Sequence, residues 1–420
     1  MKKSTILIGK VARLVARLRG GGSALPGLVV EKIDPGFLRD VLSKLPRGVV
    51  VVSGTNGKTT TTKMVTELLE SHGLRVFTNR TGSNFTRGVV SALLSEIRRW
   101  RLDADIAVLE LDEAHAVQFV RQVRPTYTLL LNVLRDQLDR FGEIDQTAKL
   151  LTTVAKSTRQ TVVLNREDPL VAAIACSLPR ARRVEFFGFN PKLAEFFPND
   201  DELHGRPTFK KSTTRASVEL KSFADRQATF SIDQKTYSVK MNITGAHNLF
   251  NAAGALALAR VVLGDAADNE VLLATLGQMK AAFGRGEVLD INGEQIELIL
   301  VKNPSGFRLS LKSQYSPTAS TMIAINDHYA DGRDMSWLWD VDFRGLKNVS
   351  VVSGIRAYDM ALRLQYDDVD FGAVEPDLRL ALREFLSGTR GKPKQIFCTY
   401  TAMLALRKNL GKIAKIEEAL

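Results

Sequence analysis

The sequence predicts an α/β fold in which a doubly wound parallel sheet is followed by a smaller α/β domain. An apolar, β-branched run at 49–52 leads into a glycine-containing turn and a helix-compatible segment, the pattern of a buried parallel strand. Strand-like and helical segments then alternate to about residue 165, as in doubly wound sheets. A chain of 420 residues is too long for one hydrophobic core, so two or three domains are expected.

The first 20 residues have a basic amphipathic pattern that predicts a helix. Lysines and arginines surround an apolar stripe that consists of Val11, Leu14, Val15 and Leu18. Such a helix either contacts a membrane surface or packs on the domain behind it, and we favour packing. A short lead-in then precedes the first strand.

The segment 54–60 has the features of a phosphate-binding loop. It lies between a strand and a helix, so its N–H groups and the positive end of the helix dipole would face an anion. Gly54 and Gly57 allow the backbone to approach phosphate oxygens, and Lys58 can reach the β- and γ-phosphates. The Thr59 hydroxyl can ligate Mg²⁺. The alternative, a plain strand–turn–helix with a solvated lysine, leaves the order of these residues unexplained.

Acidic residues follow a later strand of the same predicted sheet. The expected strands are 49–53, 74–78, 105–111, 127–133 and 160–164. Glu110, Asp112 and Glu113 fall at the carboxyl end of the third strand, where open sheets bind ligands. They are therefore expected beside a Mg²⁺ ion on the nucleotide, and the alternative is a solvated acidic loop.

The remaining chain predicts two further regions. Short alternating stretches at 186–242 predict antiparallel strands that form a β insertion. From Ile291 onwards, further strand-like runs predict the second sheet. Between two of these runs, the segment 326–343 holds five aspartates and two tryptophans. A single tryptophan here could simply pack in the core, and a single aspartate could cap a turn. The density of these residues at the end of a strand favours a functional site instead.

Composition narrows the class of protein. The net charge of +12 suits nucleic acid, anionic lipid or a phosphorylated substrate, and no zinc-finger or RNA-binding signature supports nucleic acid. The two cysteines, Cys176 and Cys398, make neither a disulfide framework nor a four-cysteine metal site. No apolar run reaches the ~18 residues of a membrane span, and the N-terminus is unlike a signal peptide, so a cytoplasmic location is expected.

The motifs resemble the Mur ligase family. The loop Gly-Thr-Asn-Gly-Lys-Thr-Thr at 54–60 is similar to the family's ATP loop, 245–251 to its Gly-x-His-Asn-x-x-Asn motif, and 284–287 to its Gly-Arg-x-Glu interdomain turn. The resemblance implies a Mur ligase-like ATP-binding domain with Mg²⁺ held by Thr59, Glu110 and Glu113. The implied ATP contacts are Gly54, Thr55, Asn56, Gly57, Lys58, Thr59, Thr60, Asn251 and Arg285.

The same resemblance implies the domain boundaries. An N-terminal helix and lead-in would occupy 1–44, the central ATP-binding domain 45–290 and the C-terminal domain 291–420. Two positions depart from the wider family: Gln137 replaces a histidine that helps to bind a second metal or to position substrate, and Lys302 replaces the histidine of a His-Asn-Pro strand end.

The segments 82–88, 326–343, 354–363 and 399–403 narrow the resemblance to the MurT family, the synthetase subunits of lipid II isoglutaminyl synthase. This implies ATP-dependent amidation of the D-glutamate α-carboxylate of lipid II, at the inner face of the cell membrane. Ammonia would come from a GatD-type glutaminase partner. In this family an aspartate of the synthetase completes the partner's Cys–His pair, and both Asp331 and Asp334 are candidates.

Many MurT proteins carry a four-cysteine zinc ribbon in the β insertion. This chain has no cysteine between 177 and 397, so no structural zinc is predicted. Two other functions stay open. A stand-alone amino-acid ligase is disfavoured by Lys302, Gln137 and the Asp/Trp run, and a non-catalytic nucleotide-binding scaffold by the intact Lys58, Thr59 and Glu110.

Overall fold

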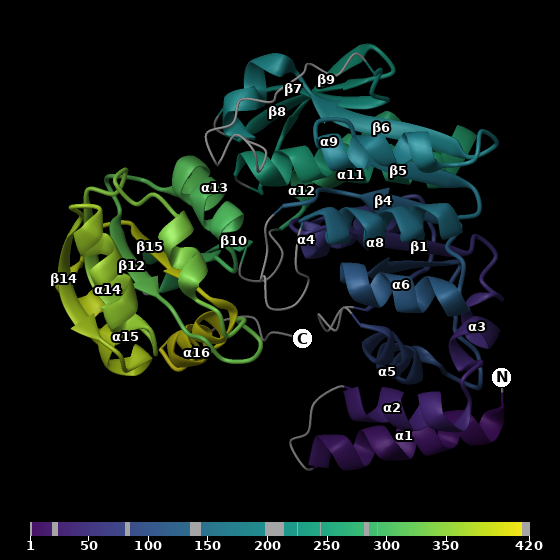
Figure 1. Cartoon of the computed structure of the whole chain (residues 1–420), viewed down its shortest axis with the longest axis horizontal. Coiled ribbons are helices and arrows are strands. Elements are labelled where there is room, and N and C mark those ends of the chain that lie inside the picture. Colours follow the sequence, from purple (N-terminus) through teal and green to yellow (C-terminus); the bar gives the residue numbers. More distant parts are fainter. Residues whose placement is uncertain are drawn as a thin grey trace.

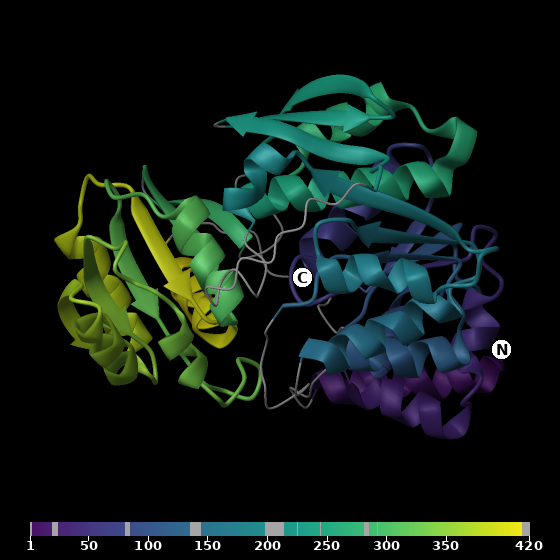
Figure 2. The same ribbon diagram turned by 45° about the horizontal axis from the view of Figure 1, so that its top comes forward.

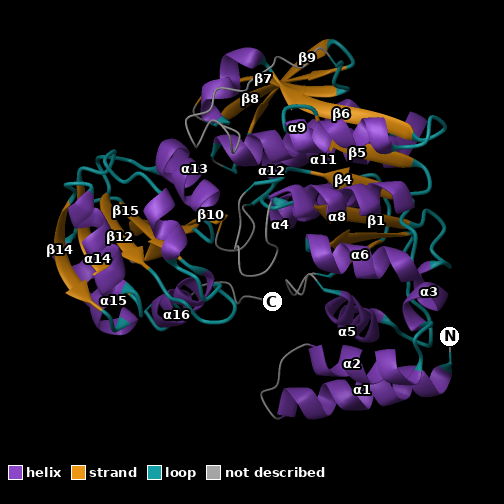
Figure 3. Ribbon diagram, viewed as in Figure 1, coloured by secondary structure: helices purple, strands orange, loops and turns teal. Residues whose placement is uncertain are grey.

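The computed structural model describes residues 2–18, 24–79, 85–134, 144–197, 214–224, 226–243, 245–280, 285–291 and 293–413. Two sheet-containing domains lie side by side, and a pair of N-terminal helices caps the larger domain at the end opposite β8 and β9 (Figures 1 and 2). Figure 3 shows that helices cover both sheets.

The larger domain is built on one sheet, which contains nine strands in the described residues. Its order is β2-β3-β1-β4-β5-β6-β7-β8-β9, parallel from β2 to β7 and antiparallel from β7 to β9. The strands are β1 (Val49–Ser53), β2 (Val76–Thr78), β3 (Ile106–Glu110), β4 (Tyr127–Leu130), β5 (Thr161–Asn165), β6 (Arg183–Phe189), β7 (Val218–Ala224), β8 (Gln227–Ile232) and β9 (Lys235–Lys240). All five predicted parallel strands are confirmed. The strands of the predicted insertion extend this sheet, because β7 pairs with β6.

Helices cover both faces of this sheet. One face carries α4 (Lys58–Glu70), α11 (Ala246–Leu263) and α12 (Asn269–Gln278). The other carries α3 (Phe37–Leu42), α5 (Thr86–Glu96), α6 (Glu113–Gln122) and α8 (Ile144–Ser157), with α9 (Pro169–Ala173) beside α8. Among these helices, α11 shows most clearly how the size of the side chains suits close packing.

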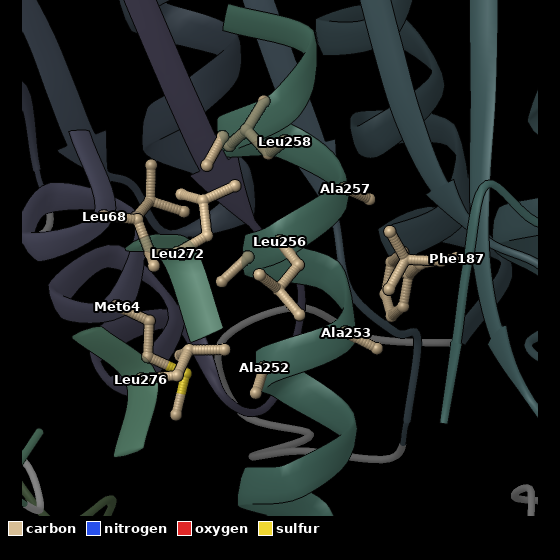
Figure 4. Packing of buried hydrophobic residues seen from close by; sticks show 14 of the residues in the cluster. Met64, Leu68, Phe187, Ala252, Ala253, Leu256, Ala257, Leu258, Leu272 and Leu276 are labelled. Atoms are coloured by element: carbon tan, nitrogen blue, oxygen red, sulfur yellow. The ribbon is translucent and has the colours of Figure 1, made fainter. Parts of the chain in front are cut away.

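Small residues let α11 approach its neighbours closely. In Figure 4, Leu256 packs between α11 and the side chains of α4 and α12, while Ala253 and Ala257 face Phe187 of β6. A methyl group at Gly254 would lie 3.2 Å from the Phe187 ring. In the described residues, one helical stretch, Ala246–Ala266, is long and apolar enough to span a membrane, contrary to the expectation of none. It is the mostly buried core helix of this domain.

The smaller domain has a six-stranded sheet of order β10-β11-β15-β12-β13-β14 in the described residues. These strands are β10 (Arg285–Ile291), β11 (Glu294–Leu300), β12 (Ser320–Ala324), β13 (Asn348–Ser353), β14 (Asp370–Glu375) and β15 (Lys394–Cys398). One face packs on α13 (Pro304–Gln314), the short helix η4 (Ser336–Asp340) and α14 (Ala357–Tyr366), and the other on α15 (Leu378–Gly388) and α16 (Tyr400–Leu410). The helices that follow β12 and β15 thus cover opposite faces, which makes the carboxyl ends of these strands a topological switch point.

The N-terminal helices α1 (Lys3–Leu18) and α2 (Ala24–Ile33) form a pair that packs on α5. The predicted helix is confirmed, and so is its packing on the domain behind it, but the side that packs is not the apolar stripe. Ile6 and Ala16 are buried, whereas Val11, Leu14, Val15 and Leu18 are exposed. Small side chains on the opposite face, including Gly9, let α1 approach α2 and α5 closely.

Candidate nucleotide site

The predicted phosphate loop lies at the carboxyl end of β1 and leads directly into α4. Gly57 has φ 87° and precedes the first residue of the helix, so a glycine suits this position. A Cβ atom at Gly57 would lie 2.6 Å from Oδ1 of Asn251. The structure thus brings Asn251 of α11 against the loop, as expected for a residue of the same site.

The segment after β4 holds the loop in shape. Asn132 accepts hydrogen bonds from the N–H groups of Thr55 (3.0 Å, to its carbonyl) and Asn56 (2.8 Å, to its side chain). The Thr55 hydroxyl donates to the carbonyl of Leu134 and accepts from its N–H. Two loop N–H groups are therefore engaged within the protein, which leaves the first turn of α4 as the anion-binding part.

Lys58 lies folded over the loop. Its ammonium group donates to the carbonyls of Gly54 (2.6 Å) and Thr55 (3.1 Å), and it lies 3.7 Å from Oε2 of Glu113. Only 5% of the residue is exposed. A buried cation beside a phosphate loop, held by two carbonyls and close to one carboxylate, is well placed to bind phosphate oxygens.

The oxygen atoms around Thr59 fit a magnesium ion shared with phosphate. The Thr59 hydroxyl donates to Oε1 of Glu110 at 2.8 Å. In the described residues, Oδ1 of Asp112 and Oε2 of Glu113 are buried without a hydrogen-bond partner. Mg²⁺ commonly takes one or two carboxylates together with nucleotide phosphates. No group of three His, Cys, Asp or Glu side chains with metal-binding geometry occurs in the described part of the chain.

A cavity of about 640 Å³ opens in front of the loop, between the two domains. The loop, the ends of β4 and β5 and the start of α11 line it from the larger domain, and β11 and α13 from the smaller one. Its walls contain Asn56, Gly57, Thr60, Asn132, Asn165, Glu167, Asp168, Phe189, Phe197, His247, Asn248, Phe250, Asn251, Lys302, Ser305, Arg308, Lys312, Asp342 and Arg344. The volume is within the usual range for a small-molecule site.

One end of the cavity is aromatic. The Phe189 ring stacks on Phe197 at 4.7 Å between centroids, and Phe250 lies 5.1 Å from Phe189 and 5.2 Å from Phe197. His247 and Asn248, at the start of α11, lie beside this cluster. Flat apolar walls with a few polar groups suit a nucleobase, while the loop at the other end suits phosphates.

The smaller domain contributes two residues that the sequence analysis did not assign to the site. Lys302 donates to the carbonyl of Thr55 at 3.3 Å. Asn303 donates to Oδ1 of Asn56 at 3.1 Å, and its own Oδ1 caps α13 by accepting from Gly306. The sequence analysis noted Lys302 as a family departure only. Its position at the end of an apolar run, just before a proline helix start, is the signal that could have identified it.

Burial raises the pKa of Glu167, another cavity residue, against the opposing effect of Arg166, whose guanidinium contacts it at 2.5 Å. Arg166 is itself buried and donates to the Phe189 carbonyl at 2.8 Å. This pair therefore fixes the backbone of the aromatic end.

Two predicted features, Gln137 and the segment 82–84, lie outside the described residues. The backbone of Arg285 begins β10, but its side chain is not described.

The aspartate-rich segment lies at the switch point of the smaller sheet, and its two candidates differ sharply. Asp331 is 2% exposed and accepts from the Thr401 N–H (2.8 Å), the Thr401 hydroxyl and the His328 N–H (3.1 Å). Burial raises the pKa of Asp331. Asp334 is exposed, and a hydrogen bond from Ser336 lowers the pKa of its carboxyl. Asp331 fixes the loop on α16, whereas Asp334 is an accessible, ionised carboxylate.

Comparisons with known proteins agree with this geometry. The Mur ligase middle domain model matches residues 52–259, and the MurT ligase C-terminal model matches 300–403. A MurT subunit of lipid II isoglutaminyl synthase from Streptococcus pneumoniae is 29% identical over 96% of this chain and 96% of its own length. The corresponding subunit from Staphylococcus aureus is 28% identical over 87% of this chain and 88% of its own length.

The fold comparison points the same way. The structure of the MurF ligase from Thermotoga maritima in complex with ADP superposes with a TM-score of 0.65 at 19% identity, covering 90% of this chain and 83% of that one. The chain thus combines a Mur ligase middle domain with a MurT ligase C-terminal domain, and it is similar to MurT subunits over nearly its whole length.

Proposed function

We propose that this chain is the ATP-dependent synthetase subunit of a glutamine-dependent lipid II isoglutaminyl synthase. It would amidate the α-carboxylate of D-glutamate in the lipid II stem peptide. The observation that carries the proposal is the loop site, in a chain related to MurT subunits over nearly its whole length. Lys58 folds onto the loop, the Thr59 hydroxyl donates to Glu110, and Asn56, Gly57 and Thr60 of the loop line the cavity together with Lys302.

The chemistry proceeds in two steps. The substrate carboxylate oxygen attacks the γ-phosphorus of ATP, and the bond to the bridging oxygen breaks to release ADP and form an acyl phosphate. Ammonia then attacks the acyl carbon, loses a proton, and phosphate departs. A bound Mg²⁺ ion would neutralise charge on the phosphates, held by Thr59, Glu110 and Glu113.

Within this scheme the chain positions and stabilises charge. Lys58 would exchange the carbonyls of Gly54 and Thr55 for phosphate oxygens and stabilise the negative charge of the transferring group. Lys302 would bring a second cation from the smaller domain when the two domains close on the nucleotide. The aromatic end would hold the base, and Arg285 is proposed to reach the phosphates.

The source of ammonia is proposed to be a glutaminase subunit of the GatD type. An exposed aromatic surface on α14 and on η4, the short helix that begins two residues after Asp334, supports this. Tyr358, Leu362 and Tyr366 are spaced four residues apart along α14 and are exposed, and the neighbouring Tyr329, Trp339 and Ile355 are exposed as well. Tyr and Trp are enriched among residues that dominate binding energy at protein interfaces.

Asp334 is then the better candidate for completing the partner's catalytic Cys–His pair. It is exposed beside this surface and its carboxyl stays ionised, as required to orient a histidine and stabilise its positive form. Both carboxylate oxygens of Asp331 already accept hydrogen bonds, from the loop and from α16, so we assign this residue a positioning role. Because the substrate is linked to a membrane lipid, we expect the reaction to take place at the inner face of the cell membrane, with the protein on the cytoplasmic side.

The test distinguishes amidation from amino-acid addition, the reaction of an independent ligase. The chain is incubated with ATP, Mg²⁺ and lipid II, with either ammonium or a set of amino acids, and the product mass is measured. The proposal expects a carboxamide with ammonium and no amino-acid adduct. An adduct with any amino acid, or no ADP formation with either acceptor, would refute it.

A further inference from the structure

The exposed side of α1 forms a continuous apolar stripe. Leu7, Val11, Leu14, Val15 and Leu18 follow the spacing i, i+4, i+7, i+8, i+11, which places them on one side of a helix. Leu7, Leu14 and Leu18 are 57%, 59% and 79% exposed. No other part of the described chain covers them.

The opposite side of α1 is fixed on the domain, so the stripe cannot turn inward without breaking it. A Cβ atom at Gly9 would lie 2.7 Å from Leu94 of α5 and 2.8 Å from Val30 of α2. Ile6 is fully buried, and the Thr5 hydroxyl donates to Asp34 at 3.0 Å. The apolar stripe is therefore a permanent part of the surface.

The charge around the stripe has a single sign. Residues 1–30 contain no aspartate or glutamate, and they contain the six basic residues Lys2, Lys3, Lys10, Arg13, Arg17 and Arg19. Lysine and arginine beside an apolar stripe give a helix affinity for an anionic lipid surface in two ways, through burial of the stripe and through attraction to the headgroups.

A basic aromatic turn continues this surface at the start of α1. Arg98 and Arg101 pair across a turn whose central residues, Arg99 and Trp100, both have positive φ (47° and 66°). All four side chains are exposed, and the Lys3 ammonium lies 6.0 Å from the centre of the Trp100 ring. Tryptophan and arginine are the residues expected at the boundary between headgroups and acyl chains.

We propose that α1 and the 98–101 turn dock the protein on an anionic membrane, with α1 lying in the plane of the headgroups. A protein partner is disfavoured here because residues 1–30 and the 98–101 turn supply basic residues and no acidic ones. The aromatic surface on α14, by contrast, mixes both charges, with Arg356 paired to Asp327 and Asp359. The inference rests on this surface and not on the proposed amidation, although it would hold the chain where a lipid-linked substrate is found.

The test measures co-sedimentation of the full chain with phosphatidylcholine vesicles, with and without phosphatidylglycerol. The variant Leu14→Gln/Leu18→Gln removes two leucines of the stripe. The matched control, Leu380→Gln/Leu404→Gln, changes two exposed leucines on α15 and α16. We expect the wild type to bind only the anionic vesicles, and to bind them less strongly as the salt concentration rises. The stripe variant should bind these vesicles at least about tenfold more weakly than the wild type. The control should bind as the wild type does.

ADP binding and the unfolding temperature check that both variants fold, and no lipid II or amidation is involved. The proposal is overturned if the wild type does not bind anionic vesicles, if it binds neutral vesicles equally well, or if the stripe variant keeps full binding. It is also overturned if the stripe variant loses self-association or a protein partner while vesicle binding is absent, because the face is then a protein interface.

Discussion

The two neighbouring aspartates, Asp331 and Asp334, test which residue of this chain serves the glutaminase site of the partner subunit. Asp331→Asn and Asp334→Asn each remove one charge from the same loop, but the structure gives them different consequences. Asp334 is exposed, and its replacement can still accept from the Ser336 N–H, so the free energy of unfolding should change by less than about 0.5 kcal/mol. The partner's histidine would lose its orienting charge, with a loss of about 10⁴-fold by analogy with the serine-protease triad.

Asp331→Asn should act on stability instead. The carboxylate of Asp331 accepts hydrogen bonds from three donors. In an asparagine, an NH₂ group would replace one of the two oxygens and would face a donor in place of an acceptor. An N–H group left without an acceptor in this buried position costs about 1–3 kcal/mol. The loop that carries Asp334 would loosen from α16, so both stability and glutamine-dependent activity should fall.

The assay uses the complex reconstituted with its glutaminase. Amidation of lipid II is measured with glutamine and, separately, with ammonium chloride, and unfolding of each variant is followed in denaturant. Asp334→Asn should lose glutamine-dependent amidation and keep the ammonium-dependent reaction. Asp359→Asn, which removes another exposed carboxylate from the same surface, serves as the control and should keep both reactions. If Asp334→Asn keeps the glutamine reaction, or if ammonium does not rescue it, the assignment of Asp334 is wrong.

Three further outcomes are expected. Lys58→Ala should abolish amidation even with ammonium chloride, because phosphoryl transfer itself fails, while Lys63→Ala, at a half-buried lysine of the same helix, keeps it. Ammonium-dependent product from Lys58→Ala would contradict the site. Elemental analysis of the purified chain should find no stoichiometric zinc, and one zinc per chain would require a site not yet recognised. The Arg75 guanidinium lowers the pKa of Asp105 from 3.8 to about 2. Asp105 thus stabilises the fold above pH 3.8, and this contribution is lost as the pH falls through about 2. Asp105→Asn should therefore cost about 1 kcal/mol in denaturant titrations at neutral pH, and the same cost at pH 2 would refute this.

The parallel strands of the larger domain were predictable because buried strands are continuous apolar runs. β10 and β14 were missed for the corresponding reason. Both lie at an edge of the smaller sheet. β14 is nowhere fully buried, and its short apolar run, Phe371 to Val374, contains a glycine and lies between Asp370 and Glu375, so it does not stand out as a strand. Local pattern identifies strands by burial, and edge strands have little of it.

The site shows the same division between local and tertiary information. The phosphate loop, Lys58 and Thr59 are contiguous, so their spacing was enough to place them. The contacts of Lys302 and Asn303 with the loop span 247 residues and exist only because the two domains meet there. Sequence could not separate Asp331 from Asp334, since burial of one and exposure of the other depend on how the loop folds onto α16.

The α1 helix gives a further case. Helical periodicity identified its apolar stripe, but the usual assumption that such a stripe faces the core fails. Gly9, Thr5 and Ala16 make the other side small enough to approach α2 and α5 closely, and close packing there leaves the larger residues outside.

The path of one oxygen atom tests the central claim most directly. Lipid II labelled with ¹⁸O in the D-glutamate α-carboxylate is amidated with ammonium and ATP, and the released phosphate is analysed by mass. If the carboxylate attacks the γ-phosphorus at the Lys58 loop, one labelled oxygen appears in the inorganic phosphate of each turnover, with ADP as the other product. Unlabelled phosphate, or label recovered in AMP, would show that the carboxylate is not activated as an acyl phosphate and would contradict the account.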